Sequence, residues 1–201
     1  MRWRPALVVI FLIVLVWSAI GPHDYFTWIL EVFPALIGIA LLLATHRRFP
    51  LTPLLAVLLL IHAVILMVGG HYTYAEVPLG FWMRDPFGFA RNHYDRIGHF
   101  AQGFVPAIVA REILVRLRVV RGRGWLFAIV VCICLAISAA YELLEFAVAI
   151  LSGSKGDAFL GTQGDVWDTQ KDMALAAVGA IAAQLLLGRI HDRQLQGMST
   201  P

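Results

Sequence analysis

Acidic, imidazole and amide side chains recur at helical spacing in three apolar stretches of the sequence. In the stretch RNHYDRIGHFAQGF, Asp95, His99 and Gln102 stand four and then three positions apart, so in a helix they share one face. The same spacing recurs in Glu142 with Glu145, and in Asp165 with Asp168 and Asp172. Charged groups inside apolar helices are costly unless they face a partner or a cavity, which makes these residues functional candidates.

Carboxylates combined with imidazoles suit two kinds of chemistry: binding of a divalent metal such as Zn or Mn, and general acid–base work on a phosphate or ester. We expect the catalytic residues to be His99, Glu142, Glu145 and Asp95. The expected metal ligands are His99, Glu142, Glu145, Asp168 and Asp172. Residues expected to contact the substrate are His71, His93, Arg96, Gln102 and Asp165. The sequence contains neither HExxH nor G-x-S-x-G, so no known hydrolase motif narrows the chemistry.

Simpler roles compete with function at several of these positions. Asp95 can act as a helix N-cap, and Arg96 as an anchor at the membrane interface. Asp172 can serve as a first-turn acid that interacts with the helix dipole. Glu142 and Glu145 are harder to explain in this way, because a pair of acids inside an apolar helix has to be protonated, paired with a cation or bound to a metal.

Composition determines the class of protein that must position these residues. The chain has 201 residues, of which 60% are hydrophobic and 14% charged, and its mean hydropathy is +0.77, which excludes a water-soluble globule. Six apolar runs approach the length of a membrane-spanning helix: 5–20, 26–45, 51–68, 97–115, 125–151 and 173–188. We therefore predict an all-α, polytopic transmembrane bundle of six spans, forming a single domain over residues 1–193 with a disordered tail at 194–201.

Basic residues predict the orientation of this bundle. Arginines precede the first run, follow the second and the sixth, and fill the turn 116–123 after the fourth. By the positive-inside rule, both termini and these turns are cytoplasmic. The net charge of +3 is explained in this way by membrane topology and by contact with membrane lipids, without a nucleic-acid partner.

This orientation brings the acidic and imidazole residues to one depth. At 1.5 Å per residue, Glu142 lies roughly 25 Å along its span from the cytoplasmic side, close to the outer edge of a core of about 30 Å. His99 lies about one turn below the same edge, and Asp172 lies at the start of the sixth span. The sequence therefore predicts one polar pocket near the outer surface.

Three motifs carry a resemblance to a known family. They are RNHYDRIGHFAQGF, YELLEF at 141–146 and FLGTQGDVWDTQKDM at 159–173. Together they resemble the YjdF-type family of uncharacterised bacterial inner-membrane proteins, and the similarity runs through nearly the whole chain. The resemblance implies a multi-pass protein of the bacterial inner membrane and no particular activity.

A looser resemblance links the chain to VanZ-like membrane proteins, which implies a connection with the cell envelope and the response to glycopeptide antibiotics. The similar features are Asp95 with His99, Glu142 with Glu145, and Asp172 ahead of a glycine. The chain departs from that pattern at Ala176, where the pattern has asparagine.

Two functional classes remain open from the sequence. One is a membrane-embedded enzyme, metal-assisted, that acts on a lipid or a lipid-linked envelope precursor at the outer leaflet. The other is a non-enzymatic module whose buried acids bind a cation, carry protons or lock the bundle, including a structural or envelope-stress role. The sequence does not indicate the oligomeric state.

Overall fold

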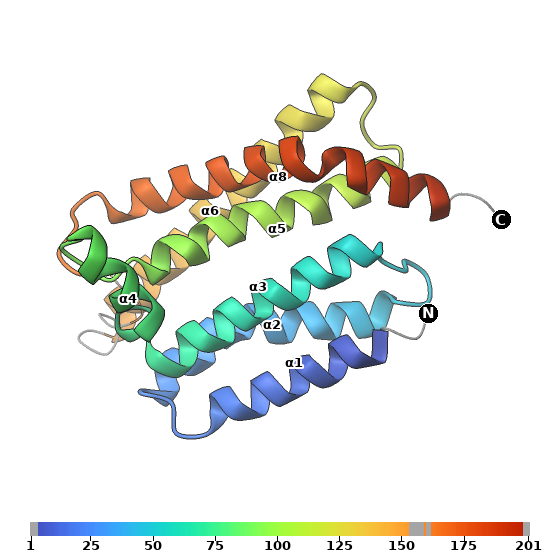
Figure 1. The fold of residues 1–201 in the computed structure, drawn as a ribbon. Helices are drawn as coiled ribbons and strands as arrows, with labels where there is room; N and C mark the ends of the chain where they lie inside the picture. Colours follow the sequence, from blue (N-terminus) through green and yellow to red (C-terminus); the bar gives the residue numbers. More distant parts are fainter. Residues whose placement is uncertain (1–3, 153–158, 160–161, 199–201) are drawn as a thin grey trace. The chain divides into compact units, whose positions relative to one another are not determined.

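The described chain is built from helices. The computed structural model describes residues 4–152, 159 and 162–198, and these residues contain no β-strand. The helices are α1 (Arg4–Ala19), α2 (Tyr25–Thr45), α3 (Pro53–Tyr72), the 3-10 helix η1 (Tyr74–Glu76), α4 (Pro78–Phe87), α5 (Tyr94–Arg116), α6 (Arg123–Ser152) and α8 (Asp168–Met198) (Figure 1). The predicted all-α class is confirmed.

Each of the six predicted apolar runs corresponds to a long helix, but one boundary differs substantially. Helix α8 begins at Asp168 and continues to Met198, so residues 194–198, which we expected in a disordered tail, are helical. Residues 199–201 lie outside the described part. The extension follows from the buried face of α8, on which His191 and Leu195 are spaced four apart.

Four of the helices are long and apolar enough to cross a membrane, namely α2, α3, α6 and α8. Helix α1 is apolar but shorter. Helix α5 has 23 residues, and its predicted span 97–115 contains the charged residues Arg111 and Glu112. The structure therefore supports a membrane protein with four candidate spans among the described residues, and the expected total of six stays a prediction.

The chain divides into two compact units, and the single domain expected over residues 1–193 stays a prediction. The first comprises Met1–Pro50, Leu60–Gly98 and Leu143–Val166, and the second comprises Leu51–Leu59, His99–Glu142 and Trp167–Pro201. The division passes through α3, α5 and α6, so each of these helices contributes to both units.

In the first unit, α1, α2 and the later part of α3 pack together (Figure 1). Their buried apolar residues are Phe11, Val32, Ala35, Ala63 and Met67. Helix α2 begins at an N-cap, where the Thr27 amide donates to Asp24 Oδ2 at 2.7 Å. This backbone hydrogen bond holds the pKa of Asp24 below its usual range.

In the second unit, α5 and α8 run in the same direction with their backbones in contact. A Cβ atom at Gly103 would overlap the carbonyl oxygen of Ala176, and one at Gly179 would overlap the carbonyl oxygen of Phe100. Small residues allow this close approach, as is common between membrane helices. The contact fixes how far one helix can slide along the other. The apolar core beside it consists of Leu55, Ala107, Ile108, Ala110, Leu114, Val130, Cys134, Ala180 and Ala183.

Candidate functional site

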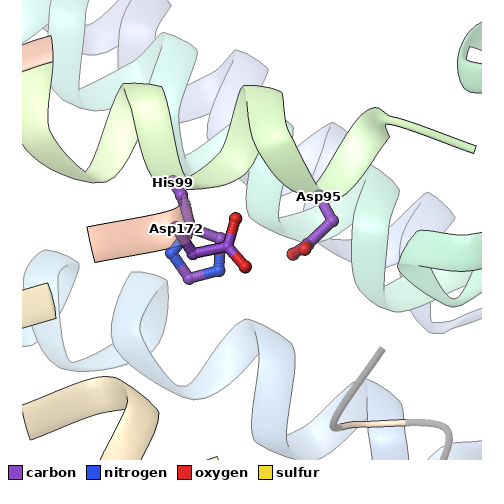
Figure 2. Close-up of side chains that lie close together, drawn as sticks. All are labelled: Asp95, His99 and Asp172. Carbon is purple, nitrogen blue, oxygen red and sulfur yellow. The ribbon is translucent and has the colours of Figure 1, made fainter. Parts of the chain in front are cut away.

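The packing of α5 against α8 positions two of the predicted site residues. His99 lies one helical turn before Gly103, and Asp172 lies one turn before Ala176, which Gly103 contacts. A ring nitrogen of His99 and a carboxylate oxygen of Asp172 consequently lie within 4.8 Å of each other (Figure 2). Both residues are buried, with 6% and 2% of their surfaces exposed. The two residues are therefore neighbours, and the pocket that we expected around them stays a prediction.

The Nδ1 atom of His99 faces an amide and a carboxylate. Gln102 Oε1 lies 3.1 Å from Nδ1, and Glu142 Oε1 of α6 lies 3.7 Å from the same atom. Because both oxygens are acceptors, this arrangement favours the tautomer with its proton on Nδ1. The other ring nitrogen, Nε2, then carries the lone pair that a metal ion would use, and the Gln102 amide orients the ring.

Asp95 adds a third ligand atom from one turn earlier on α5. One of its carboxylate oxygens lies within 4.8 Å of the His99 ligand nitrogen (Figure 2). Asp95 also lies 3.6 Å from the guanidinium of Arg91, a buried residue that the sequence did not single out. We refer to Asp95, His99, Gln102, Glu142 and Asp172 as the His99 site.

The ligand types of the His99 site suit a divalent cation. Two carboxylates and an imidazole fit the preferences of Zn and of Mn. Two ligand atoms bound to the same ion at about 2.1 Å lie at most about 4.2 Å apart. Three ligands of one tetrahedral ion lie only about 3.4 Å apart, so atoms separated by up to 4.8 Å would have to move inwards to bind the ion.

The two other acids predicted as ligands are also buried. Asp168 lies one turn before Asp172 on α8 and has 5% of its surface exposed. Glu145 follows Glu142 by three residues on α6 and has 7% exposed. Among the described residues, His99, Asp172 and Asp95 form the group whose ligand atoms lie together. His99 and Asp172 were predicted as metal ligands, and Asp95 was predicted as a catalytic residue.

Two of the predicted substrate-contacting residues bind each other in the first unit. Arg96 forms an ion pair with Asp165 at 3.0 Å, and Arg91 lies 3.7 Å from the same carboxylate. The Arg91 guanidinium also donates to the carbonyl of Thr162 at 2.7 Å. These contacts attach the start of α5 to the segment that precedes α8.

Two more residues predicted to contact substrate, His71 and His93, lie among aromatic rings in the first unit. His71 Nδ1 lies 3.1 Å from the carbonyl oxygen of Ser18, and its ring centroid is 4.5 Å from that of Trp17. His93 makes an edge-to-face contact with Phe89 at 4.7 Å. His71 therefore connects the end of α3 to the end of α1.

A second buried polar group in the second unit was missed in the sequence. Glu112 accepts hydrogen bonds from His191 Nε2 at 3.0 Å, from Arg116 at 3.0 Å and from the Thr52 hydroxyl at 2.7 Å. Arg111 donates to Asp192 at 2.6 Å and lies 3.0 Å from His191 Nδ1. We refer to Thr52, Arg111, Glu112, Arg116, His191 and Asp192 as the Glu112 network.

The hydrogen bonds of the Glu112 network are mutually consistent. A guanidinium can only donate, so His191 Nδ1 accepts from Arg111 while Nε2–H donates to Glu112. The sequence held a signal for this group, because Glu112 and Arg116 stand four apart in an otherwise apolar run. Their distant partner His191 lies beyond the predicted end of the sixth span, at 188, which is why the group was not recognised.

Glu31 is another buried acid that the sequence reading passed over. It lies on the buried face of α2 and has 5% of its surface exposed. Burial, with a contribution from the Glu31 charge, raises the pKa of Tyr94 at the start of α5. Burying an acid in an apolar helix costs free energy, and this argument singled out Glu142 as a candidate. The same argument applies to Glu31.

Comparison with known proteins places the chain in a family. Residues 4–193 match the family described as "Predicted membrane protein (DUF2238)". The chain is 55% identical over 184 residues to the Inner membrane protein YjdF of Escherichia coli (strain K12), covering 92% of this chain and 88% of the relative. No solved structure matches the chain. The predicted resemblance and inner-membrane localisation are confirmed, and the chain belongs to the DUF2238 family of membrane proteins.

Proposed function

We propose that the protein binds a divalent cation at the His99 site and uses it in chemistry on an amphiphile at the outer leaflet. The observation that carries this proposal is the group formed by Asp95, His99 and Asp172. Each of Asp95 and Asp172 offers a carboxylate oxygen within 4.8 Å of a ring nitrogen of His99. The Gln102 and Glu142 oxygens near Nδ1 support the same proposal, because ligating histidines usually donate their other N–H in this way.

The position of the site determines the kind of substrate. His99 is expected about one turn below the outer edge of the hydrocarbon core, so a substrate has to present a polar group there while its tail remains in lipid. A lipid or a lipid-linked envelope precursor meets this requirement. The cation would polarise a phosphate or ester oxygen, and Glu142 would accept the proton of the attacking group.

The proposal includes six membrane spans with both termini in the cytoplasm. The Glu112 network supports a span by α5, because its two acids are paired with two guanidinium groups and no isolated charge is left in that part of the helix. Reporter fusions after Arg48 and Arg121 are expected to be cytoplasmic, and a fusion after Asp85 external. A cytoplasmic Asp85 fusion would place the His99 site on the opposite side of the membrane.

A non-enzymatic cation-binding or structural module is the alternative function. The Glu112 network is consistent with it, because its buried charged residues are paired with one another inside the second unit. Metal binding without turnover of any lipid would agree with a cation-binding module. Absence of both metal and turnover would leave a structural bundle.

Metal binding by the detergent-purified protein tests the proposal directly. His99→Ala and Asp172→Asn are each expected to abolish tight Mn²⁺ or Zn²⁺ binding, measured by elemental analysis after equilibrium dialysis. Asp85→Asn is the matched control, because this acid is 65% exposed at its side chain and pairs with Arg84 on α4. Glu142→Gln is expected to keep the metal and to lose cellular function. Wild-type protein that binds no more metal than His99→Ala would contradict the proposal.

A further inference from the structure

Every fourth residue of α6 from Val130 to Glu142 is buried. Val130, Cys134, Ser138 and Glu142 have 0%, 0%, 0% and 7% of their surfaces exposed. The first two belong to the apolar core of the second unit, and the last lies 3.7 Å from His99. Ser138 is on the same face and lies about 6 Å further along the helix axis from Glu142, between the core and the His99 site.

The hydroxyl of Ser138 has no hydrogen-bond partner among the described residues. A serine inside a helix usually donates to the carbonyl oxygen of the preceding turn, and buried hydroxyls without a partner are rare in folded proteins. Ser18, which is equally buried, shows the ordinary pattern: it donates to Leu15 at 2.9 Å and accepts from Trp28 at 3.2 Å. The Ser138 hydroxyl is therefore available to a ligand.

We propose that Ser138 binds an oxygen atom of the ligand at the bottom of the His99 site, an inference that rests on the proposed cation site. The ligand atom is an oxygen that carries a proton, because it can then accept from the Ser138 hydroxyl and donate to the Glu142 carboxylate. A water molecule of the hydrated cation has this chemistry, and so does the hydroxyl of a lipid headgroup. The site then extends from α5 and α8 to the buried face of α6.

Mn²⁺ titration followed by electron paramagnetic resonance, combined with thermal unfolding of the metal-free protein, tests the inference. Ser138→Ala is expected to weaken Mn²⁺ binding about threefold to tenfold, the loss of one hydrogen bond. The same variant is expected to keep its unfolding temperature in the absence of metal or to raise it by about 2 to 4 °C, because a buried hydroxyl without a partner is removed. Ser138→Thr, which keeps the hydroxyl, is expected to retain the affinity.

Ser18→Ala is the matched control. It removes a partnered serine in the first unit and is expected to lower the unfolding temperature without changing Mn²⁺ affinity. Comparing detergent with nanodiscs of phosphatidylglycerol separates the two sources of oxygen. An effect of Ser138→Ala in both media identifies water, and an effect confined to nanodiscs identifies the headgroup hydroxyl.

The outcomes distinguish this inference from the proposed function. Wild-type protein that binds no Mn²⁺ contradicts the cation site itself. Wild-type binding with unchanged affinity in Ser138→Ala overturns the role of Ser138 and leaves the cation site intact. A drop in unfolding temperature as large as that of Ser18→Ala, with equal Mn²⁺ affinity in Ser138→Ala and Ser138→Thr, would identify Ser138 as a packing residue.

Discussion

The Glu112 network and the His99 site lie on the same pair of helices, about 20 Å apart along α5. In the network, the two acids Glu112 and Asp192 each bind a guanidinium, and His191 donates from one nitrogen and accepts at the other. In the His99 site, carboxylates and an amide surround one imidazole, a combination of metal-ligand types. Burial of charge alone therefore does not identify a functional site in this protein.

The comparison suggests a general criterion for reading buried charges in membrane helices. A network whose donors and acceptors match one another restricts the packing of the helices that contribute to it. A set of acceptors gathered around an imidazole instead suits a ligand that brings positive charge or protons. Substitutions in the Glu112 network are therefore expected to change stability, and substitutions in the His99 site to change ligand binding.

The largest effect is expected from Glu112→Ala. Removing this carboxylate removes the acceptor of the bonds from Arg116 and His191, and breaking a buried pair from one side typically costs about 3 to 5 kcal/mol. The free energy of unfolding in mixed micelles would measure the loss. Metal affinity in the fraction that remains folded should be unchanged, and a selective loss of metal would mean that the two regions are coupled.

A smaller effect on stability, accompanied by loss of metal affinity, is expected from Gly103→Ala. The added Cβ would overlap the Ala176 carbonyl, and overpacking of this kind costs about 1 to 3 kcal/mol. Separation of α5 from α8 would also move His99 away from Asp172. Gly188→Ala is the control, because a Cβ there has no atom within 4 Å and is expected to stabilise α8 by about 0.5 to 1 kcal/mol. Equal effects of the two substitutions would contradict the role of the close contact.

Gln102→Leu is expected to act on the site and hardly on stability. Losing the amide that orients His99 typically lowers metal affinity about 10-fold to 100-fold. Equilibrium dialysis with Mn²⁺ measures this change, and Gln102→Glu is expected to restore most of the affinity because it keeps an acceptor. Gln184→Leu removes a comparable amide, which donates to the Phe127 carbonyl at 3.2 Å, and should leave metal affinity unchanged.

The smallest effect is expected from Asp192→Asn, at the exposed end of the Glu112 network. The Asp192 side chain is 38% exposed, and partly solvated ion pairs contribute less than about 1 kcal/mol. A loss close to that of Glu112→Ala would show that the network acts as a single unit. A double substitution of both acids would then cost no more than Glu112→Ala alone.

The helices and part of the site could be predicted from the sequence because both depend on local patterns. Apolar runs of sufficient length predict helices, and acids spaced three or four apart within them predict a shared face. This pattern was enough to single out His99, Glu142 and Asp172. The sixth apolar run was predicted to end at 188, ten residues before α8 ends at Met198. The difference arises because the last turns of α8 are polar on their exposed side.

The remaining features depend on contacts between distant parts of the chain. His191 and Glu112 are 79 residues apart, and neither residue by itself indicates its partner. Gly103 and Gly179 look like ordinary membrane-helix glycines until the backbone contact is seen. Arg96 and Asp165, both expected to contact substrate, form an ion pair across 69 residues that neither residue indicates by itself.

The glycine contact between α5 and α8 ties the His99 site to one register of the two helices. A slip of α8 by one turn, about 5.4 Å, would place Ala176 or Asp168 where Asp172 stands beside His99. The backbones approach this closely because Gly103 and Gly179 carry no Cβ, so a register that brings larger residues to the contact is expected to be less favourable. Cation binding would then be thermodynamically linked to complete docking of the two helices. At a cation concentration 100 times the Kd, this linkage would add about 2.7 kcal/mol to the stability of the docked state.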